Sequence, residues 1–416
     1  MKKILITLFI IMMFGAQQVN AQTCKTTADL DGVPGQYLTA AQHPWPAARA
    51  EYFRELKTDA DKAIAKKTLE QVEKTEQQSR VGFSLTGGNW ESTFSSTGYE
   101  YAANTKLGKY YLQTAHREFV CVSGKLKLNS EYGTVLRVYV NAIPVNTLNR
   151  FLQNPFGESM GEYSLGFQYA DWKNKLNKPG DKLISLFTYL SCNNPSLIDA
   201  INSGQKYFQD IDQKNVKLNT RVPHVYRYWF VKKSTAPVLI PVSRKEYLIS
   251  LLEYYEREKL YFPAVIVKLT ADRDQYKLKT YEGWETAVNE KIELVKNTLA
   301  TQNEDWLNAQ AVVSRSEDSY QNGKNKLKEK INYNRFWQFY DSEKRGEPLY
   351  QYNPDYFKTN SKGAATPQLI TVAFRYVTMP SSMRLLDNFT EKFDYAAYAK
   401  TAGVETAEKQ RYTKID

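Results

Sequence analysis

The chain has 416 residues, of which 42% are hydrophobic and 24% charged, and its formal net charge is +11. That length allows a large core and suggests two or three domains, or one with appendages. Lysines are mixed with glutamates, which predicts a solvated basic surface, with a patch for acidic glycans, lipopolysaccharide or an anionic membrane face as the alternative. No nucleic-acid-binding motif is present, so nucleic acid is not an expected partner.

The first 21 residues have the pattern of a cleavable signal peptide. Lys2 and Lys3 form a positive start, residues 4–15 form an apolar core, and residues 19–21 (Val-Asn-Ala) fit the small-residue rule for cleavage. The apolar core is too short to span a membrane, and no later segment approaches a membrane helix. The sequence therefore predicts an exported protein, periplasmic, secreted or associated with the cell surface, with no transmembrane segment after cleavage.

Three cysteines, Cys24, Cys121 and Cys192, would meet an oxidising compartment after export. One disulfide and one remaining thiol are expected, and the three single pairings stay open. A zinc site would need a fourth ligand, so no metal site is predicted. Gln22 and Thr23 do not give Cys24 the setting of a lipoprotein signal, so lipid attachment is not expected.

The first part of the mature chain changes period at residue 81. Residues 22–47 contain glycine and proline and predict an ordered N-terminal arm, and residues 48–78 predict helix. From Val81 to Leu85, apolar residues alternate with small polar ones, which is typical of a strand. The glycine pair after it, at residues 87–88, predicts a turn, because no phosphate-loop pattern surrounds it.

Further strands and helices complete an expected α+β body over residues 48–280. Residues 108–128 predict a hairpin that turns at Ser123-Gly124, and residues 134–143 predict a strand with apolar groups on both faces. Residues 195–204 predict a short helix with proline in its first turn and glycine at its end.

The most strongly specified stretch is residues 224–258. Its beginning, HVYRYWFVK, has strand composition with apolar side chains on both faces, as in a central strand. After a second short strand, Ser243 and Glu246 have the spacing of a capping box, and Val242 and Tyr247 that of a hydrophobic staple. The helix that follows carries a single apolar stripe.

A weak internal repeat is one interpretation of two similar junctions. Ile143-Pro144-Val145-Asn146 matches Ile240-Pro241-Val242-Ser243, and in each a strand is expected to end before a capping residue and a helix. Convergence is the alternative, because proline stops a strand and Asn or Ser starts a helix.

The C-terminal part predicts a helix-rich lobe over residues 281–345 and a strand that returns to the body within residues 346–390. Residues 391–416 are expected to be a charged, mobile tail. The sequence as a whole predicts an α+β fold, an antiparallel or mixed β-sheet covered by helices, with a helix-rich C-terminal lobe.

No catalytic motif is present, and no catalytic residue or cofactor is predicted. His116 and Cys121 are five residues apart, which places them on opposite faces of one strand. The carboxylate pair of a glycosidase cannot be found by spacing, so a hydrolase is unsupported rather than excluded.

Aromatic residues offer the best candidates for binding, although most are expected to fill the core. Trp90 and Trp172 lie in loop-like stretches, and tryptophan suits sugar stacking or a protein interface. His224 and Arg227 are polar groups beside or on an apolar strand, and Arg227 is expected to pair with a buried carboxylate.

Three functional hypotheses follow. The first is an exported, non-catalytic protein that binds a protein, a glycan or another ligand. The second is a periplasmic or secreted hydrolase of glycans or peptides, which requires a cleft with two facing carboxylates. The third is an envelope assembly or scaffold component, which requires an exposed apolar stripe on residues 282–340.

Overall fold

The computed structural model describes residues 23–102, 105–145, 148–150, 185–209, 225–260, 262–273, 275–313, 339, 346–358 and 362–403. It confirms an α+β fold with mixed and antiparallel sheets. Within these ranges, no helix is both long and apolar enough to cross a membrane.

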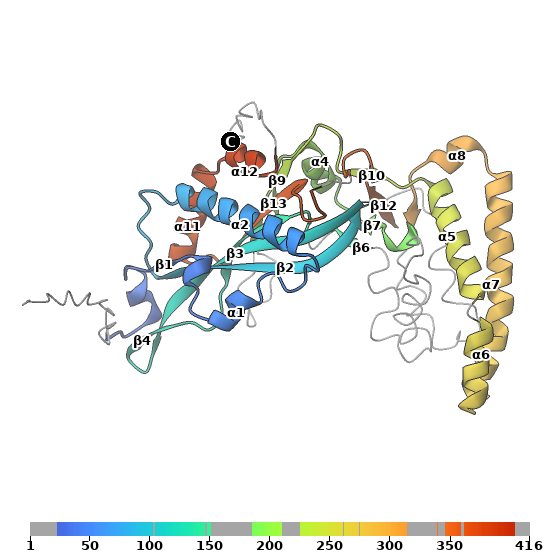
Figure 1. The fold of residues 1–416 in the computed structure, drawn as a ribbon, viewed down its shortest axis with the longest axis horizontal. Helices are drawn as coiled ribbons and strands as arrows, with labels where there is room; N and C mark the ends of the chain where they lie inside the picture. The colour runs from blue at the N-terminus through green and yellow to red at the C-terminus, as the bar shows by residue number, and fades with distance from the viewer. Residues whose placement is uncertain are drawn as a thin grey trace, which may run out of the picture.

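The body of the protein is a twisted main sheet, which forms the left half of Figure 1. Its strand order is β1-β2-β3-β5-β13-β9-β8, with β4 paired to β3, and only the β1–β2 pairing is parallel. The strands are β1 (Tyr37–Leu38), β2 (Gly88–Ala102), β3 (Thr105–Val122), β4 (Lys125–Leu128), β5 (Thr134–Val140), β8 (Lys206–Gln209), β9 (Val225–Lys232) and β13 (Leu369–Tyr376).

One face of the main sheet is covered by helices. These are α2 (Asp59–Ser79), α11 (Pro380–Glu391) and α12 (Tyr395–Thr401), with the short α1 (Pro46–Ala50) at the β2 side. Trp229 and Val231 of β9 and Phe374 of β13 lie in this core. Each fully buried side chain of this size contributes about 1.5–3 kcal/mol to folding, so these strands anchor the layer.

The opposite face of the sheet carries the alternate residues. Tyr228 and Phe230 of β9 pack there with α4 (Pro195–Ser203) and with strands of a second, smaller sheet. Strand β9 therefore has both faces covered and a hydrogen-bonded neighbour on each side, as its composition predicts.

The second sheet has the order β10-β12-β7-β6, with β11 paired to β12, and its pairings are antiparallel. Its strands are β6 (Asn149–Arg150), β7 (Leu190–Ser191), β10 (Leu239–Pro241), β11 (Val312–Val313) and β12 (Glu347–Tyr352). Tyr350 and Tyr352 contribute to the core that it shares with the main sheet.

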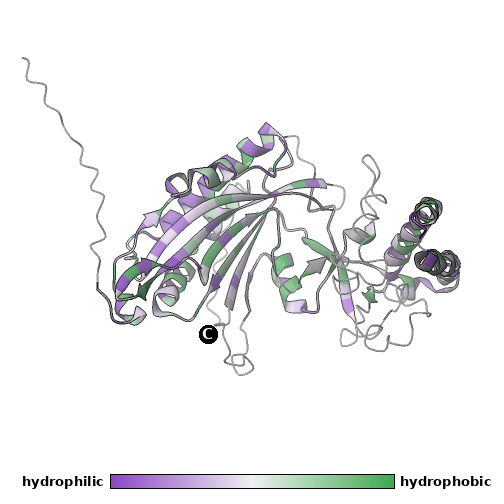
Figure 2. Ribbon diagram, turned by 90° about the horizontal axis from the view of Figure 1, so that it is seen from below, coloured by the Kyte–Doolittle hydropathy of each residue, from purple (hydrophilic) through white to green (hydrophobic). Residues whose placement is uncertain are grey.

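A helical arm extends from the second sheet at the right of Figures 1 and 2. It consists of α5 (Arg244–Lys259), α6 (Phe262–Ala271), α7 (Gln275–Thr301) and α8 (Glu304–Asn308). Figure 2 shows α5 and α7 side by side and end-on, and Leu251 and Val288 are fully buried between them. The arm therefore begins at Arg244 and includes part of the expected body, not only residues from 281 onward.

The structure contains the helix cap, the helix end and the hairpin turn that short sequence motifs predict. The backbone N–H of Glu246 donates to the Ser243 hydroxyl (3.1 Å), and the N–H of Ser243 donates to the Glu246 carboxylate (2.8 Å), which closes the capping box of α5. Gly204 ends α4 at φ +70°, a conformation that favours glycine. The β3–β4 hairpin turns at Ser123-Gly124, both with positive φ, as a two-residue hairpin turn requires.

Several expectations differ from the structure. Residues 81–85 form no strand, and β2 instead begins at Gly88, within the expected turn. Arg117 and His116 of β3 approach Gly88 so closely that no Cβ atom would fit there, which explains a glycine in this strand. Residues 149–150 form strand β6 where the repeat hypothesis requires a helix, so the fold gives the repeat no support.

The described part of residues 391–416 also differs from the expected mobile tail. Its residues 395–401 form α12, which Asp394 caps by accepting from Ala397 N–H (3.0 Å). Tyr398 of this helix is buried in the same core as α2. Residues 404–416 lie outside the described residues.

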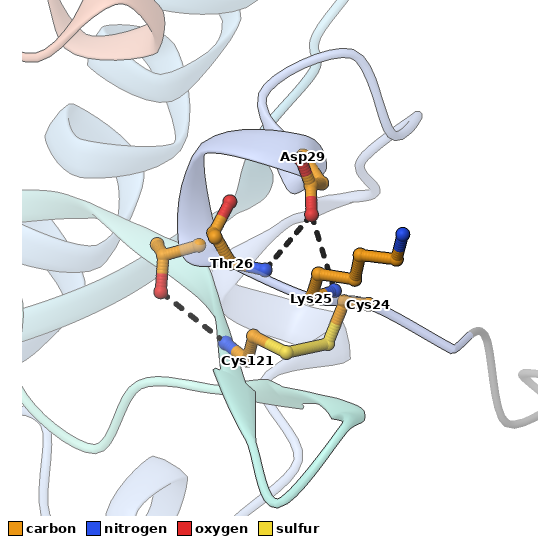
Figure 3. The surroundings of a disulfide bond; sticks show 6 residues. Cys24, Lys25, Thr26, Asp29 and Cys121 are labelled. Atoms are coloured by element: carbon orange, nitrogen blue, oxygen red, sulfur yellow. Dashed lines mark hydrogen bonds between the residues drawn. A yellow bond between two sulfur atoms is a disulfide. The ribbon is translucent and has the colours of Figure 1, made fainter.

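A disulfide joins Cys24 to Cys121, with a Cα–Cα distance of 5.9 Å (Figure 3). Asp29 stabilises the chain beside it by accepting from the backbone N–H groups of Thr26 (2.8 Å) and Lys25 (3.1 Å). These hydrogen bonds lower the pKa of Asp29 and keep its carboxylate charged. The disulfide holds the N-terminal segment against the end of β3. The third cysteine, Cys192, is buried and is not part of a disulfide.

Candidate functional site

The candidate site lies on the face of the main sheet opposite α2. Arg137 of β5 is opposite Ala373 of β13, and Val135 is opposite Arg375. Side chains alternate between the two faces of a strand, so both arginines point to the same side. Tyr226 of β9 is opposite Arg375 on the other side of β13 and joins this face.

These residues surround a cavity of about 300 Å³, which we call the Arg–Tyr pocket. Its volume is at the lower end of the range of small-molecule sites. The pocket is lined by Val135, Arg137, Tyr139, Ile143, Pro144, Val145, Leu148, Tyr226, Ala373 and Arg375. Apolar walls with a few convergent polar groups are typical of ligand sites.

A chain of hydrogen bonds fixes the two guanidinium groups. Arg375 donates through Nε to the carbonyl oxygen of Gly133 (3.2 Å) and through Nη2 to that of Tyr132 (2.9 Å). The Tyr132 hydroxyl accepts from Gln113 Nε2 (3.1 Å), and Gln113 Oε1 accepts from Arg137 Nε (2.7 Å). Both arginines are thereby pre-oriented, which lowers the entropy cost of binding a ligand.

Gly133 permits this arrangement. A Cβ atom at this position would lie 2.6 Å from Cγ1 of Val377, so only glycine lets the loop before β5 approach the end of β13 so closely. That approach brings the carbonyl oxygens of Tyr132 and Gly133 within reach of Arg375.

The pocket is electropositive. Among the described residues, its lining contains two guanidinium groups and no carboxylate. Burial disfavours the charged form of Arg137, but its pKa is nevertheless raised, and its hydrogen bond with Tyr139 acts in that direction. Burial raises the pKa of Tyr139, whose phenol is therefore neutral and can donate or accept.

Aromatic rings continue the pocket wall along the sheet. The ring centroids of Tyr111 and Tyr139 are 5.1 Å apart. Tyr226 stacks on Tyr228 at 5.6 Å with an interplanar angle of 3°. Such packing holds the rings rigid, so Tyr139 and Tyr226 offer fixed apolar surfaces with polar tips.

No family model, no curated protein and no solved structure matches this chain. The function must therefore be argued from the site itself.

The binding candidates from the sequence lie away from the pocket or outside the described residues. Trp90 is 2% exposed, stacks on Phe374 in the core and donates from Nε1 to Glu76 (2.9 Å), so in this conformation it presents no surface to a ligand. Arg227 lies on the other face of β9 from Tyr226, with its guanidinium over the rings of Phe208 and Tyr376, at 4.6 and 5.6 Å. Its pairing with a buried carboxylate stays a prediction. Trp172 and His224 lie outside the described residues.

Three groups of types suited to catalysis have structural roles here. Cys121 is held in the disulfide and cannot act as a thiolate nucleophile. Glu73 and Glu76 of α2 are buried against the sheet, where Glu73 accepts from Ala40 N–H (2.8 Å) and Glu76 binds Arg80 (2.8 Å). Burial raises the pKa of Glu73, which is a consequence of its position in the core.

The sequence feature that marks Arg227 as a binding candidate also marks Arg137 and Arg375. Each is a charged residue within an otherwise apolar strand, TVLRVYV and LITVAFRY. Such a residue requires a special environment on its face of the sheet. That the two share one pocket depends on the β5–β13 register, which the sequence does not reveal.

Proposed function

We propose that this chain is an exported, non-catalytic binding protein and that the Arg–Tyr pocket is its ligand site. The observation that carries the proposal is the composition of the pocket: two fixed guanidinium groups, two phenols and apolar walls. Among the described residues its lining includes no carboxylate, histidine, cysteine or serine, the side chains that hydrolases most often use as nucleophile, acid and base.

Export is supported by the signal-peptide pattern and by the disulfide close after it. A cross-link between Cys24 and Cys121 persists in an oxidising compartment and is rare in the cytosol. The assembly hypothesis has less support, because Val288, Ile292 and Val295 of its required stripe are buried within the arm.

Export is tested by expressing the full chain in a bacterial host and determining the first residue by mass spectrometry. We expect a protein outside the cytoplasm that begins at Gln22 and contains one disulfide. The matched control is Leu8→Arg, which places a charge in the apolar core of the leader and should leave the chain uncleaved in the cytoplasm. An uncleaved wild-type chain in the cytoplasm would refute export.

The ligand site is tested by a thermal-shift screen of the mature protein against a library of small metabolites. Ala373→Met fills the pocket floor, whereas Ala63→Met makes the same change at an exposed position of α2, beyond the opposite face of the sheet. Ligands of the pocket should raise the Tm of the wild type and of Ala63→Met but not that of Ala373→Met. A screen in which no compound stabilises the wild type, or in which all hits stabilise Ala373→Met equally, contradicts the proposal.

A further inference from the structure

We infer that the ligand of the Arg–Tyr pocket is an organic oxyanion: a carboxylate, sulfate or phosphate group attached to a ring-sized body. This inference rests on the proposed function, because it assigns the chemical class of the ligand at the same site.

The donors for the oxyanion are already in place. A guanidinium carries five N–H donors in a planar fork. Arg375 directs one from Nε and one from Nη2 to the carbonyl oxygens of Gly133 and Tyr132. Arg375 lines the pocket and retains its other N–H donors. A guanidinium fork matches two oxygens of a carboxylate, sulfate or phosphate.

Arg137 supplies the second positive charge. Its Nε is committed to Gln113, a neutral acceptor, and its side chain also hydrogen-bonds Tyr139 in the pocket lining. In the β5–β13 register Arg137 and Arg375 are diagonal neighbours, whose Cα atoms are about 7–8 Å apart.

Two like charges so close together repel each other unless a counter-charge is present. Among the described residues, no carboxylate forms an ion pair with Arg137 or Arg375. An anion bound between them would remove this repulsion, and a neutral ligand would not.

The rest of the pocket fits a body of ring size. Tyr139 and Tyr226 provide aromatic surface, and Ile143, Val145 and Leu148 provide an apolar wall. A bare inorganic ion would leave this surface exposed to water, whereas a ring or the apolar face of a sugar would cover it. The pocket therefore favours an anion with an organic body over phosphate or sulfate alone.

The experiment is calorimetric titration of the mature protein with five probes at low ionic strength. Phenyl phosphate, phenyl sulfate and benzoate share the ring and differ in the anionic group. Phenol keeps the ring without the charge, and inorganic phosphate keeps the charge without the ring. We expect at least one aryl anion to bind at least about tenfold more tightly than phenol and inorganic phosphate, and its affinity to fall as salt is added.

Arginine variants test where the aryl anion binds. Arg137→Gln and Arg375→Gln should each weaken its binding about 10- to 100-fold, the value of one charge-assisted contact. Arg227→Gln is the matched control, because it removes the same charge from the opposite face of the same sheet and should bind as the wild type does. Far-ultraviolet circular dichroism and the Tm confirm that each variant is folded.

Two results would overturn the inference. One is that no aryl anion binds more tightly than phenol; the other is that a folded Arg137→Gln or Arg375→Gln binds as tightly as Arg227→Gln does. Either result leaves the proposed binding function standing if the Ala373→Met screen still identifies pocket ligands. If that screen also finds none, the function and the inference fail together.

Discussion

Replacing His116 by leucine should remove one source of acid sensitivity from the fold. His116 lies on β3 beneath α11 and is 0% exposed. Neither ring nitrogen has a hydrogen-bond partner within the described structure. A buried imidazole without partners strongly disfavours its charged form.

The surroundings of His116 set the direction of this effect. The pKa of His116 is lowered from 6.5 to about 4, mainly by burial and also by the nearby Arg384, against a smaller opposing effect of Asp31. Glu118 Oε1 lies 3.9 Å from Nδ1, but burial raises the pKa of this carboxyl, which weakens it as a counter-charge. The imidazole is therefore neutral in the folded protein at neutral pH.

The sign and size of the effect follow from linkage. Between pH 6.5 and about 4 the unfolded chain binds a proton at His116 that the folded chain does not, so stability falls as the pH falls. A difference of about 2.5 pKa units corresponds to about 3.4 kcal/mol below pH 4. Between pH 7.5 and 5.0 the expected loss is about 2 kcal/mol.

Urea unfolding of the wild type and of His116→Leu at pH 7.5, 6.0 and 5.0 measures this loss. The variant should gain about 2 kcal/mol relative to the wild type between the first and the last pH. Other titrating groups, Glu118 included, are present in both proteins and largely cancel in the difference. A stability difference that stays constant with pH would refute the reasoning.

Three further changes test the fold. Cys24→Ser with Cys121→Ser opens a cross-link between residues 97 positions apart, and urea unfolding should show a loss of up to about 4–5 kcal/mol; an unchanged midpoint would contradict the cross-link. Ser243→Ala removes the hydroxyl of the α5 capping box and should cost about 1 kcal/mol in the same assay; no loss would mean that the cap does not stabilise the arm. Leu251→Ala, at a fully buried position of α5, should cost about 2–5 kcal/mol, whereas Ile249→Ala, 51% exposed on the same helix, should change stability by about 0.5 kcal/mol or less; equal effects would show that α5 and α7 do not pack as described.

Sequence patterns were sufficient where the determining contacts are local. The two apolar faces of β9 follow from alternation alone, and the start of α5 follows from Ser243 and Glu246, which are three residues apart. The position of the β3–β4 turn follows from the adjacent residues Ser123 and Gly124. In each case the residues that specify the structure are neighbours along the chain.

Patterns failed where distant segments decide the structure. Gly88 begins β2 instead of forming a turn, because His116 and Arg117 of the neighbouring strand pack against it. Proline is unfavourable within a strand, yet Pro348 lies in β12, because this segment pairs with β7, β10 and β11. The Arg–Tyr pocket depends in the same way on the pairing of β5 with β13.

The central place of β13 in the sheet has a consequence for biosynthesis. Leu369–Tyr376 is inserted between β5 and β9, yet it follows almost all of the chain. A nascent polypeptide that has not yet reached this segment has two long, unsatisfied strand edges, which are templates for aggregation. Ribosome-bound chains, or chains terminated before this segment, should therefore depend on chaperones until Leu369–Tyr376 has been synthesised.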